Sequence, residues 1–229
     1  MFTSLLSLRQ QQKRLLTKIV EGPLKDYLQT PIPPRKQSLL ETEFLVLDFE
    51  TTGMDPAKEA ILSVGYTVIR EGRVILRESG HHIVQVNKQI PRESVAIHKI
   101  TDDRSQQGRH LTDIMGKLLH KMAGRVLIAH YAPIERGFLN AACQELYGYK
   151  LPMRILDTLA IEKKRMQRRQ QPLVINQLRL FNLREQYSLP RYKAHNALED
   201  AIATAELFLV QMAYINRDIR KLSLKDVSY

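Results

Sequence analysis

The chain has 229 residues, of which 44% are hydrophobic, and a formal net charge of +11. The hydrophobic content is sufficient for a large buried core, which excludes a disordered or fibrous protein. The positive charge favours a polyanionic partner such as nucleic acid, because Lys and Arg neutralise phosphates; solubility alone is the other interpretation.

The first residues do not have the pattern of a secretory signal, because their apolar residues precede their charges. Glu206 interrupts the longest apolar run, so we expect no membrane span and a cytoplasmic location. Cys143 is the only cysteine, which excludes an intrachain disulfide and a thiolate metal cluster. Its apolar neighbours indicate a small buried side chain.

Residues 4–28 predict an amphipathic helical arm, because apolar residues recur there at near-helical spacing. The apolar stripe consists of Leu5, Leu8, Leu15, Leu16 and Ile19. Prolines within residues 30–36 end the helix. We therefore divide the chain into an arm and proline-rich linker at 1–40, a main domain at 41–217 and a tail at 218–229. We expect the arm to pack on the main domain, with a partner or a membrane surface as alternatives.

The main domain begins with strand patterns and continues with alternating strands and helices. The segments 43–50, 60–69 and 73–84 read as an antiparallel meander with a turn at Gly72. Helices are then predicted at 111–123, 134–148 and 197–214, and strands at 125–130 and 154–159. The alternation implies parallel strands added to the meander. We expect an α/β domain with a mixed five-stranded sheet flanked by helices.

Two carboxylates stand at the end of the first predicted strand. Side chains alternate along a strand, so Asp48 and Glu50 point to one face while Phe49 points to the other. The apolar residues before them indicate that they emerge where the strand ends. A solvated strand terminus is the structural interpretation of this pair on its own.

A second strand-to-helix junction carries His130 and Glu135. Pro133 suits the first turn of the following helix, where a negative charge such as Glu135 is favoured by the helix dipole. Taken alone, Glu135 is explained by that dipole, and His130 is explained as a hydrogen-bonded histidine at a strand end.

The third group of polar residues opens the last long helix. Asn196 and Glu199 resemble a capping box, which places the helix start at Asn196 and leaves His195 just outside it. Asp200 lies in the opening turns. A residue before a helix can fold back over it, so His195 and Asp200 can serve one pocket.

These segments together resemble the DEDDh 3′–5′ exonucleases, the DnaQ-like group that includes the proofreading epsilon subunit of bacterial DNA polymerase III. The resemblance covers roughly residues 44–212. It rests on LDFETTG at 47–53, AHYAPIERGFL at 129–139 and HNALEDA at 195–201, with AIHKIT at 96–101 and LDTL at 156–159 between them. It implies a ribonuclease-H-like fold.

The resemblance also implies a site and a chemistry. Asp48 would bridge two Mg²⁺ or Mn²⁺ ions, with Glu50 and Asp200 holding the ion beside the nucleophilic water. His195 would take the proton of that water, a role that suits an imidazole near neutral pH. Glu135 stands where the family usually has Asp, and would act on the second ion through water. Like charges this close need cations, since two at 4 Å repel by about 4 kcal/mol at an effective dielectric of 20.

Further residues are assigned to the substrate. Thr51 and Thr52 follow the first carboxylates and are expected to contact the terminal nucleotide, and we add His130 to this group. The basic run at 162–171 predicts phosphate contacts by Lys163, Lys164 and Arg165, with a solvated face as the alternative. The sequence QLRLF at 177–181 resembles a sliding-clamp peptide, or is simply part of an amphipathic core segment.

The sequence thus predicts a metal-dependent 3′–5′ exonuclease that releases 5′-mononucleotides, acting on single-stranded or frayed DNA. An exonuclease for short RNA is the alternative enzyme, because the same acidic site cleaves both. A catalytically silent nucleic-acid-binding module is the alternative from another class. A polymerase subunit or a sliding clamp is the possible protein partner, with DNA proofreading, replication or repair as the setting.

Overall fold

The structure, a computed structural model, describes residues 6–193 and 195–228. Residues 1–5 of the predicted arm, Leu5 among them, and the last residue of the predicted tail lie outside this description.

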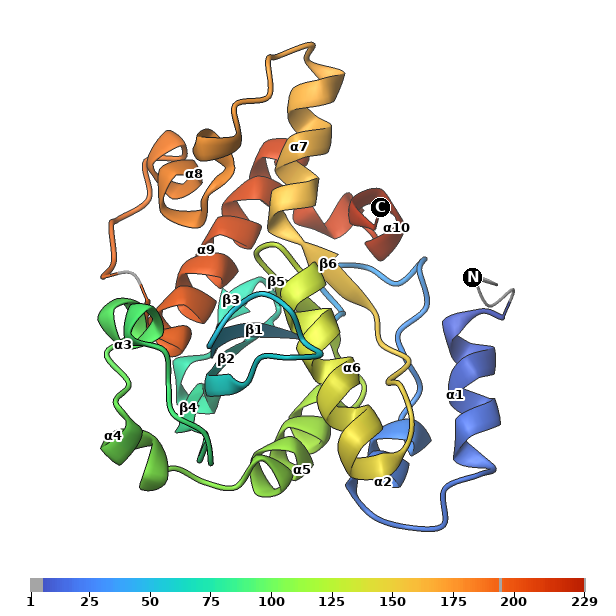
Figure 1. The fold of residues 1–229 in the computed structure, drawn as a ribbon. Coiled ribbons are helices and arrows are strands. Elements are labelled where there is room, and N and C mark those ends of the chain that lie inside the picture. Colours follow the sequence, from blue (N-terminus) through green and yellow to red (C-terminus); the bar gives the residue numbers. More distant parts are fainter. Residues whose placement is uncertain (1–5, 194, 229) are drawn as a thin grey trace.

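A mixed sheet forms the centre of the fold (Figure 1). Within the described residues it has six strands in the order β3-β2-β1-β5-β6, with β4 also paired to β2. β1 is antiparallel to β2 and parallel to β5, and β6 is parallel to β5. The strands are β1 (Phe44–Thr51), β2 (Ile61–Arg70), β3 (Arg73–Val74), β4 (Gly80–Ile83), β5 (Val126–Ala129) and β6 (Ile155–Asp157).

The predicted third strand is split, which raises the strand number from the expected five to six in the described part of the chain. A short 3₁₀ helix, η1 (Leu76–Glu78), separates β3 from β4, and both strands pair with β2. Glu78 of η1 takes part in a salt-bridge network, in which Arg70 contacts Glu78 at 2.7 Å and Glu43 at 2.5 Å.

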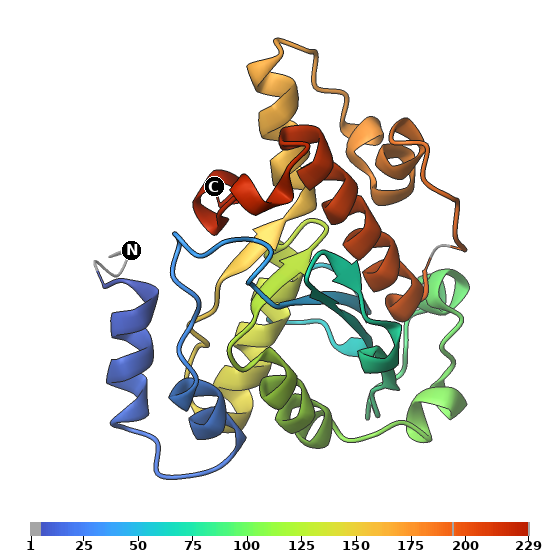
Figure 2. The ribbon, with the colours of Figure 1, turned by 180° about the vertical axis from the view of Figure 1, so that it is seen from behind.

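Helices cover both faces of the sheet (Figures 1 and 2). α5 and α6 pack against Leu45 and Leu47 of β1, whereas α7 and α9 pack against Phe44 and Val46 on the opposite face. Phe208 of α9 stacks on Phe44 with ring centroids 5.3 Å apart, and burying such a ring stabilises the fold by about 1.5–3 kcal/mol. The helices are α1 (Leu8–Leu16), α2 (Pro23–Gln29), α3 (Arg92–His98), α4 (Asp102–Gln106), α5 (Leu111–Met122), α6 (Pro133–Tyr147), α7 (Thr158–Arg168), α8 (Leu180–Gln186), α9 (Ala197–Ile215) and α10 (Leu224–Val227).

The residues of the predicted arm form two helices, α1 and α2, with a break between them. α2 buries Leu24, Tyr27 and Leu28 in the core that α5 and α6 share, and the Tyr27 hydroxyl donates to the carbonyl of Pro152 at 2.8 Å. Leu15 of α1 packs on the same core. Among the described helices, none combines the length and the apolar character that crossing a bilayer requires.

Candidate active site

Strand β1 carries two carboxylates on its α9 face. Its side chains alternate, so that Leu45, Leu47 and Phe49 enter the core beneath α5 and α6. Asp48 and Glu50 are thereby left on the other face, where the first turns of α9 lie. Asp48 is partly buried and Glu50 is buried.

The start of α9 brings the third carboxylate. Asn196 caps the helix, because its side-chain oxygen accepts from the backbone N–H groups of Leu198 and Glu199 at 3.1 and 3.3 Å. The backbone at His195 is left-handed, with φ 69°, and this turns the chain back over the helix. The N–H of His195 donates to Asp200 Oδ2 at 3.1 Å.

Gly65 allows α9 to approach the sheet. It lies on β2 directly opposite Asp48 in the antiparallel pair. A Cβ at this position would lie 2.0 Å from the carbonyl carbon of Ala197 and 2.3 Å from the nitrogen of Leu198. The helix backbone therefore touches the strand, and this contact places Asp200 beside the β1 carboxylates.

Asp48, Glu50 and Asp200 each offer a carboxylate oxygen within 4.8 Å of the others. Burial raises the pKa of Asp48 well above its usual value, and the neighbouring charges of Glu135, Asp200 and Glu50 raise it further. Burial, followed by the charge of Glu50, raises the pKa of Asp200 to about 7. The cluster thus resists carrying all of its negative charges at once.

Glu135 lies in the first turn of α6 and is buried, with 3% of its surface exposed. Burial is the main cause that raises its pKa to about 8, and Glu135 in turn raises the pKa of Asp48. The side chain is therefore electrostatically linked to the cluster, although it is not among the three carboxylates that meet within 4.8 Å.

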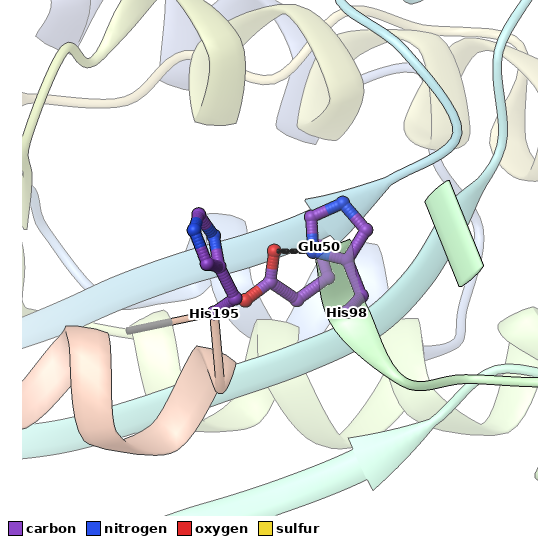
Figure 3. Close-up of side chains that lie close together, drawn as sticks. All are labelled: Glu50, His98 and His195. Atoms are coloured by element: carbon purple, nitrogen blue, oxygen red, sulfur yellow. Dashed lines mark ion pairs between the residues drawn. The ribbon is translucent and has the colours of Figure 1, made fainter. Parts of the chain in front are cut away.

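His98 is a residue of the site that the sequence analysis did not single out. Its Nδ1 lies 2.5 Å from Glu50 Oε2, and its ring meets the His195 ring edge-to-face with centroids 6.0 Å apart. Figure 3 shows the Glu50 carboxylate between the two rings. Glu50, His98 and His195 form a second group with ligand atoms within 4.8 Å. The sequence feature that could have assigned His98 to the site was its position inside the AIHKIT segment.

The residues assigned to the terminal nucleotide have partners within the protein. The Thr51 hydroxyl donates to the carbonyl of Gly53 at 2.7 Å, and the Thr52 hydroxyl donates to Glu59. The two ring nitrogens of His130 lie 2.8 Å from Thr158 Oγ1 and 2.8 Å from the carbonyl oxygen of Leu178. The ring of His130 therefore has no free nitrogen for a substrate, which favours the structural interpretation.

The predicted basic run lies on α7 and just beyond it. Arg165 contacts the buried carboxylate of Glu162 at 2.5 Å, whereas Lys163 is exposed and Lys164 is half-buried. In the clamp-like segment, Leu178 is 7% exposed and its carbonyl faces His130. A peptide that binds a clamp must offer its apolar side chains, so the observed packing favours the core interpretation of this segment.

The donor set at the cluster fits a hard divalent cation. Glu50 Oε1, Glu135 Oε2 and Asp200 Oδ1 are buried and have no hydrogen-bond partner among the described residues. A buried carboxylate oxygen without a partner is costly, and a cation relieves that cost. Oxygen and imidazole donors without sulfur suit Mg²⁺ or Mn²⁺. The acidic residues and histidines of the site are therefore able to hold a metal.

Comparison with known proteins gives concordant results. The family model described as "Exonuclease" matches residues 45–208. A DNA polymerase III PolC-type protein of Thermotoga petrophila is 29% identical over 166 residues, which are 72% of this chain and 12% of the relative. The 3′-5′ exonuclease DinG of Staphylococcus aureus (strain USA300) is 25% identical over 167 residues, which are 73% of this chain and 18% of the relative. The chain thus spans less than a fifth of the length of these relatives.

The fold also matches a solved structure. Exonuclease X in complex with 5′ overhanging duplex DNA superposes with a TM-score of 0.60 and 20% identity. The match covers 80% of this chain and 98% of the other. This likeness confirms the ribonuclease-H-like α/β fold that the motifs predicted.

Proposed function

We propose, from the premise that this chain belongs to the exonuclease family, that it is a metal-dependent 3′–5′ exonuclease acting on DNA. It would hydrolyse single-stranded or frayed ends and release 5′-mononucleotides. The observation that carries the proposal is the meeting of Asp48, Glu50 and Asp200 within 4.8 Å. Two residues of β1 and one of α9 converge there, and Glu50 and Asp200 each bring a buried oxygen that has no hydrogen-bond partner in the described part of the chain.

The carboxylates would hold the metal. Asp48, Glu50 and Asp200 supply oxygen atoms from two elements, and Glu135 supports them from the first turn of α6. Bound Mg²⁺ or Mn²⁺, as a pair of ions, would activate water and stabilise negative charge on the scissile phosphate. The protein supplies the fixed ligand positions, because Gly65 allows α9 to lie against the sheet.

His195 would accept the proton of the attacking water. Its backbone N–H is held by Asp200, and its ring stands next to the Glu50 carboxylate and the ring of His98. The hydrogen bond fixes the residue outside the helix, where the imidazole lies beside the Glu50 carboxylate (Figure 3). An imidazole beside the carboxylates that would hold the metal is placed to act as a general base towards water at this site.

DNA is proposed rather than RNA because one relative is named as a DNA polymerase and the matched exonuclease X structure contains duplex DNA. A polymerase is the class of protein partner that the PolC-type relative suggests. Replication, proofreading or repair is the corresponding setting.

The test compares oligonucleotides of DNA and RNA labelled at the 3′ or the 5′ end, with Mg²⁺, Mn²⁺ or EDTA. We expect immediate release of label as mononucleotide from the 3′-labelled DNA, a ladder of shortening products from the 5′-labelled DNA, and no cleavage in EDTA. The Asp200→Asn variant is the control for contaminating nuclease. Cleavage in EDTA, or first release from the 5′ end, would reject the proposal.

A further inference from the structure

The charge of the protein is concentrated in one segment. Residues 163–193, which we name the basic lobe, contain nine basic residues and one acidic residue, Glu185. The lobe thus accounts for eight of the eleven net positive charges of the chain. It comprises most of α7, all of α8 and the segments that follow each of them.

Most basic side chains of the lobe are available to solvent. Two are bound within the protein, because Arg165 pairs with Glu162 and the buried Arg184 pairs with Glu206. Six others are exposed, and none of these six forms an ion pair within the described part of the chain. The six are Lys163, Arg168, Arg169, Arg179, Arg191 and Lys193.

The lobe leads directly into the candidate active site. Figures 1 and 2 show α7 and α8 at the end of the molecule away from α2 and α5, with the described segment after α8, up to residue 193, running towards the first turn of α9. In the sequence, His195 follows shortly after this segment and precedes α9. A strand bound along the lobe would therefore be directed towards His195 and the carboxylates.

A buried arginine fixes the lobe to α9. The guanidinium of Arg184 donates to the carbonyl of Ala203 at 2.6 Å, to the carbonyl of Pro190 at 2.8 Å and to Glu206 at 2.8 Å. Tyr192 donates to the same Glu206 at 2.8 Å. These bonds hold α8 and residues 190–192 against α9, which gives this end of the lobe a defined position relative to the site.

The lobe also exposes apolar side chains between its charges. Leu173 and Val174 are 41% and 44% exposed, and Ile175 is 84% exposed. Phosphate alone does not need apolar partners. Single-stranded nucleic acid can use them, because its unpaired bases present faces that a duplex hides.

We propose that the basic lobe binds single-stranded nucleic acid upstream of the 3′ end, with Arg168, Arg169 and Arg179 on phosphates and Ile175 against a base. This inference rests on the proposed exonuclease function and adds to it the part of the substrate that lies outside the site. The lobe contributes to affinity for a long strand and contributes nothing for a substrate of one nucleotide.

The first experiment measures the salt dependence of binding. Fluorescence anisotropy with a DNA strand of about 16 nucleotides is recorded in the Asp200→Asn background, which keeps the strand intact. The lobe variant combines Arg168→Gln, Arg169→Gln and Arg179→Gln. A matched control combines Arg9→Gln, Lys13→Gln and Lys18→Gln, which are exposed on or just after α1 and remove the same charge.

We expect the lobe variant to lower the magnitude of the slope of log affinity against log salt by about 2, since each phosphate contact on a single strand contributes about 0.7. The control variant should keep the original slope. An unchanged slope in the lobe variant, or an equal decrease in both variants, would overturn the inference, because the effect would then be absent or would reflect total charge alone.

A second variant tests the apolar contact. Ile175→Ser should weaken binding of the single strand without changing the salt slope, and should leave binding of a blunt duplex unchanged. Equal affinity of Ile175→Ser and the unmodified chain for the single strand would show that the lobe does not contact bases, which contradicts the proposal.

A small substrate distinguishes failure of the lobe proposal from failure of the exonuclease function on which the proposal rests. The p-nitrophenyl ester of thymidine 5′-monophosphate reports the site alone, because it is too short to reach the lobe. If the otherwise unmodified chain does not cleave it with Mn²⁺, the proposed function fails. If the chain and the lobe variant cleave it equally while the two differ only on the long strand, the inference is supported; equal rates on both substrates overturn it.

Discussion

Gly65 and Ala197 are in backbone contact, so that any side chain at position 65 would overlap the first turn of α9. We expect Gly65→Ala to displace the helix start and to separate Asp200 from Asp48. The overlap should lower the free energy of unfolding by about 3 kcal/mol, at the upper end of the overpacking range. Thermal unfolding measures the loss of stability, and the nuclease rate reports the separation of Asp200 from Asp48.

Gly116→Ala is the matched control for this substitution. Gly116 lies within α5, and a Cβ there would meet Pro23 at 3.4 Å, close to ordinary contact. Since Ala is favoured over Gly in a helix by about 1 kcal/mol, this variant should be neutral or slightly more stable. Equal behaviour of the two variants would disprove the special role of Gly65.

Asp200→Asn should abolish hydrolysis and preserve the fold. Loss of a metal ligand is expected to lower the rate by more than about 100-fold, the upper limit for outer-shell partners. In the unmodified chain, Mn²⁺ at 100 times its dissociation constant should add about 2.7 kcal/mol to the folded state. The variant should lose most of this metal-dependent rise in melting temperature. A full rise in Asp200→Asn would remove this residue from the ligand set.

Glu135 is tested by two substitutions. If it acts on the metal through water, Glu135→Asp restores the residue usual in the family and should keep the rate within about tenfold, because a water molecule can fill the gap. Glu135→Gln removes the charge and should lower the rate by about 10 to 100-fold. Steady-state rates of the unmodified chain and of the two variants, measured with Mg²⁺, test this prediction. Equal rates for all three proteins would show that Glu135 is only a helix-dipole partner.

The metal-free protein should lose stability as the pH rises. Burial raises the pKa of Asp200 from 3.8 to about 7 and that of Glu135 from 4.5 to about 8. At a pH between the ordinary and the raised pKa of each group, the folded state holds more protons than the unfolded chain. The free energy of unfolding therefore falls with increasing pH. Melting temperatures in EDTA from pH 4 to 9 should show this decline, and Asp200→Asn should flatten it.

The same shifts make metal binding depend on pH, because bound protons must leave before a cation enters. The rise in melting temperature at fixed Mn²⁺ should therefore increase with pH through the pKa values of Asp200, about 7, and Glu135, about 8. A constant rise between pH 5 and 8 would contradict the assignment of these carboxylates to the metal.

Local patterns were sufficient to predict most strands of the sheet and the carboxylates at the end of β1, although not the split of the third strand. The alternation along β1 places Asp48 and Glu50 on one face, and the Asn196 cap defines where α9 begins. Both follow from contacts within a few residues. The parallel strands β5 and β6 were likewise predicted, from short apolar runs in the part of the chain where strands and helices alternate, whereas the helix α7 that follows β6 was not predicted.

Contacts between distant segments were not predictable in this way. His98 joins the site because α3 lies beside the end of β1, and no periodic pattern encodes that approach. A glycine inside the strand at 60–69 indicated close backbone approach in principle, but it did not name Ala197 as the neighbour. Likewise, no local pattern indicated that Glu78, in the break between β3 and β4, pairs with Arg70 of β2.

The left-handed backbone of His195 implies a trade-off between stability and activity. A residue with a β-carbon at φ 69° carries a conformational cost of about 1–2 kcal/mol that glycine would avoid. Exchange of this histidine for glycine should thus yield a more robust but inactive protein. A search for thermostable variants would therefore select against the imidazole, because the conformational cost is removed together with the proposed general base.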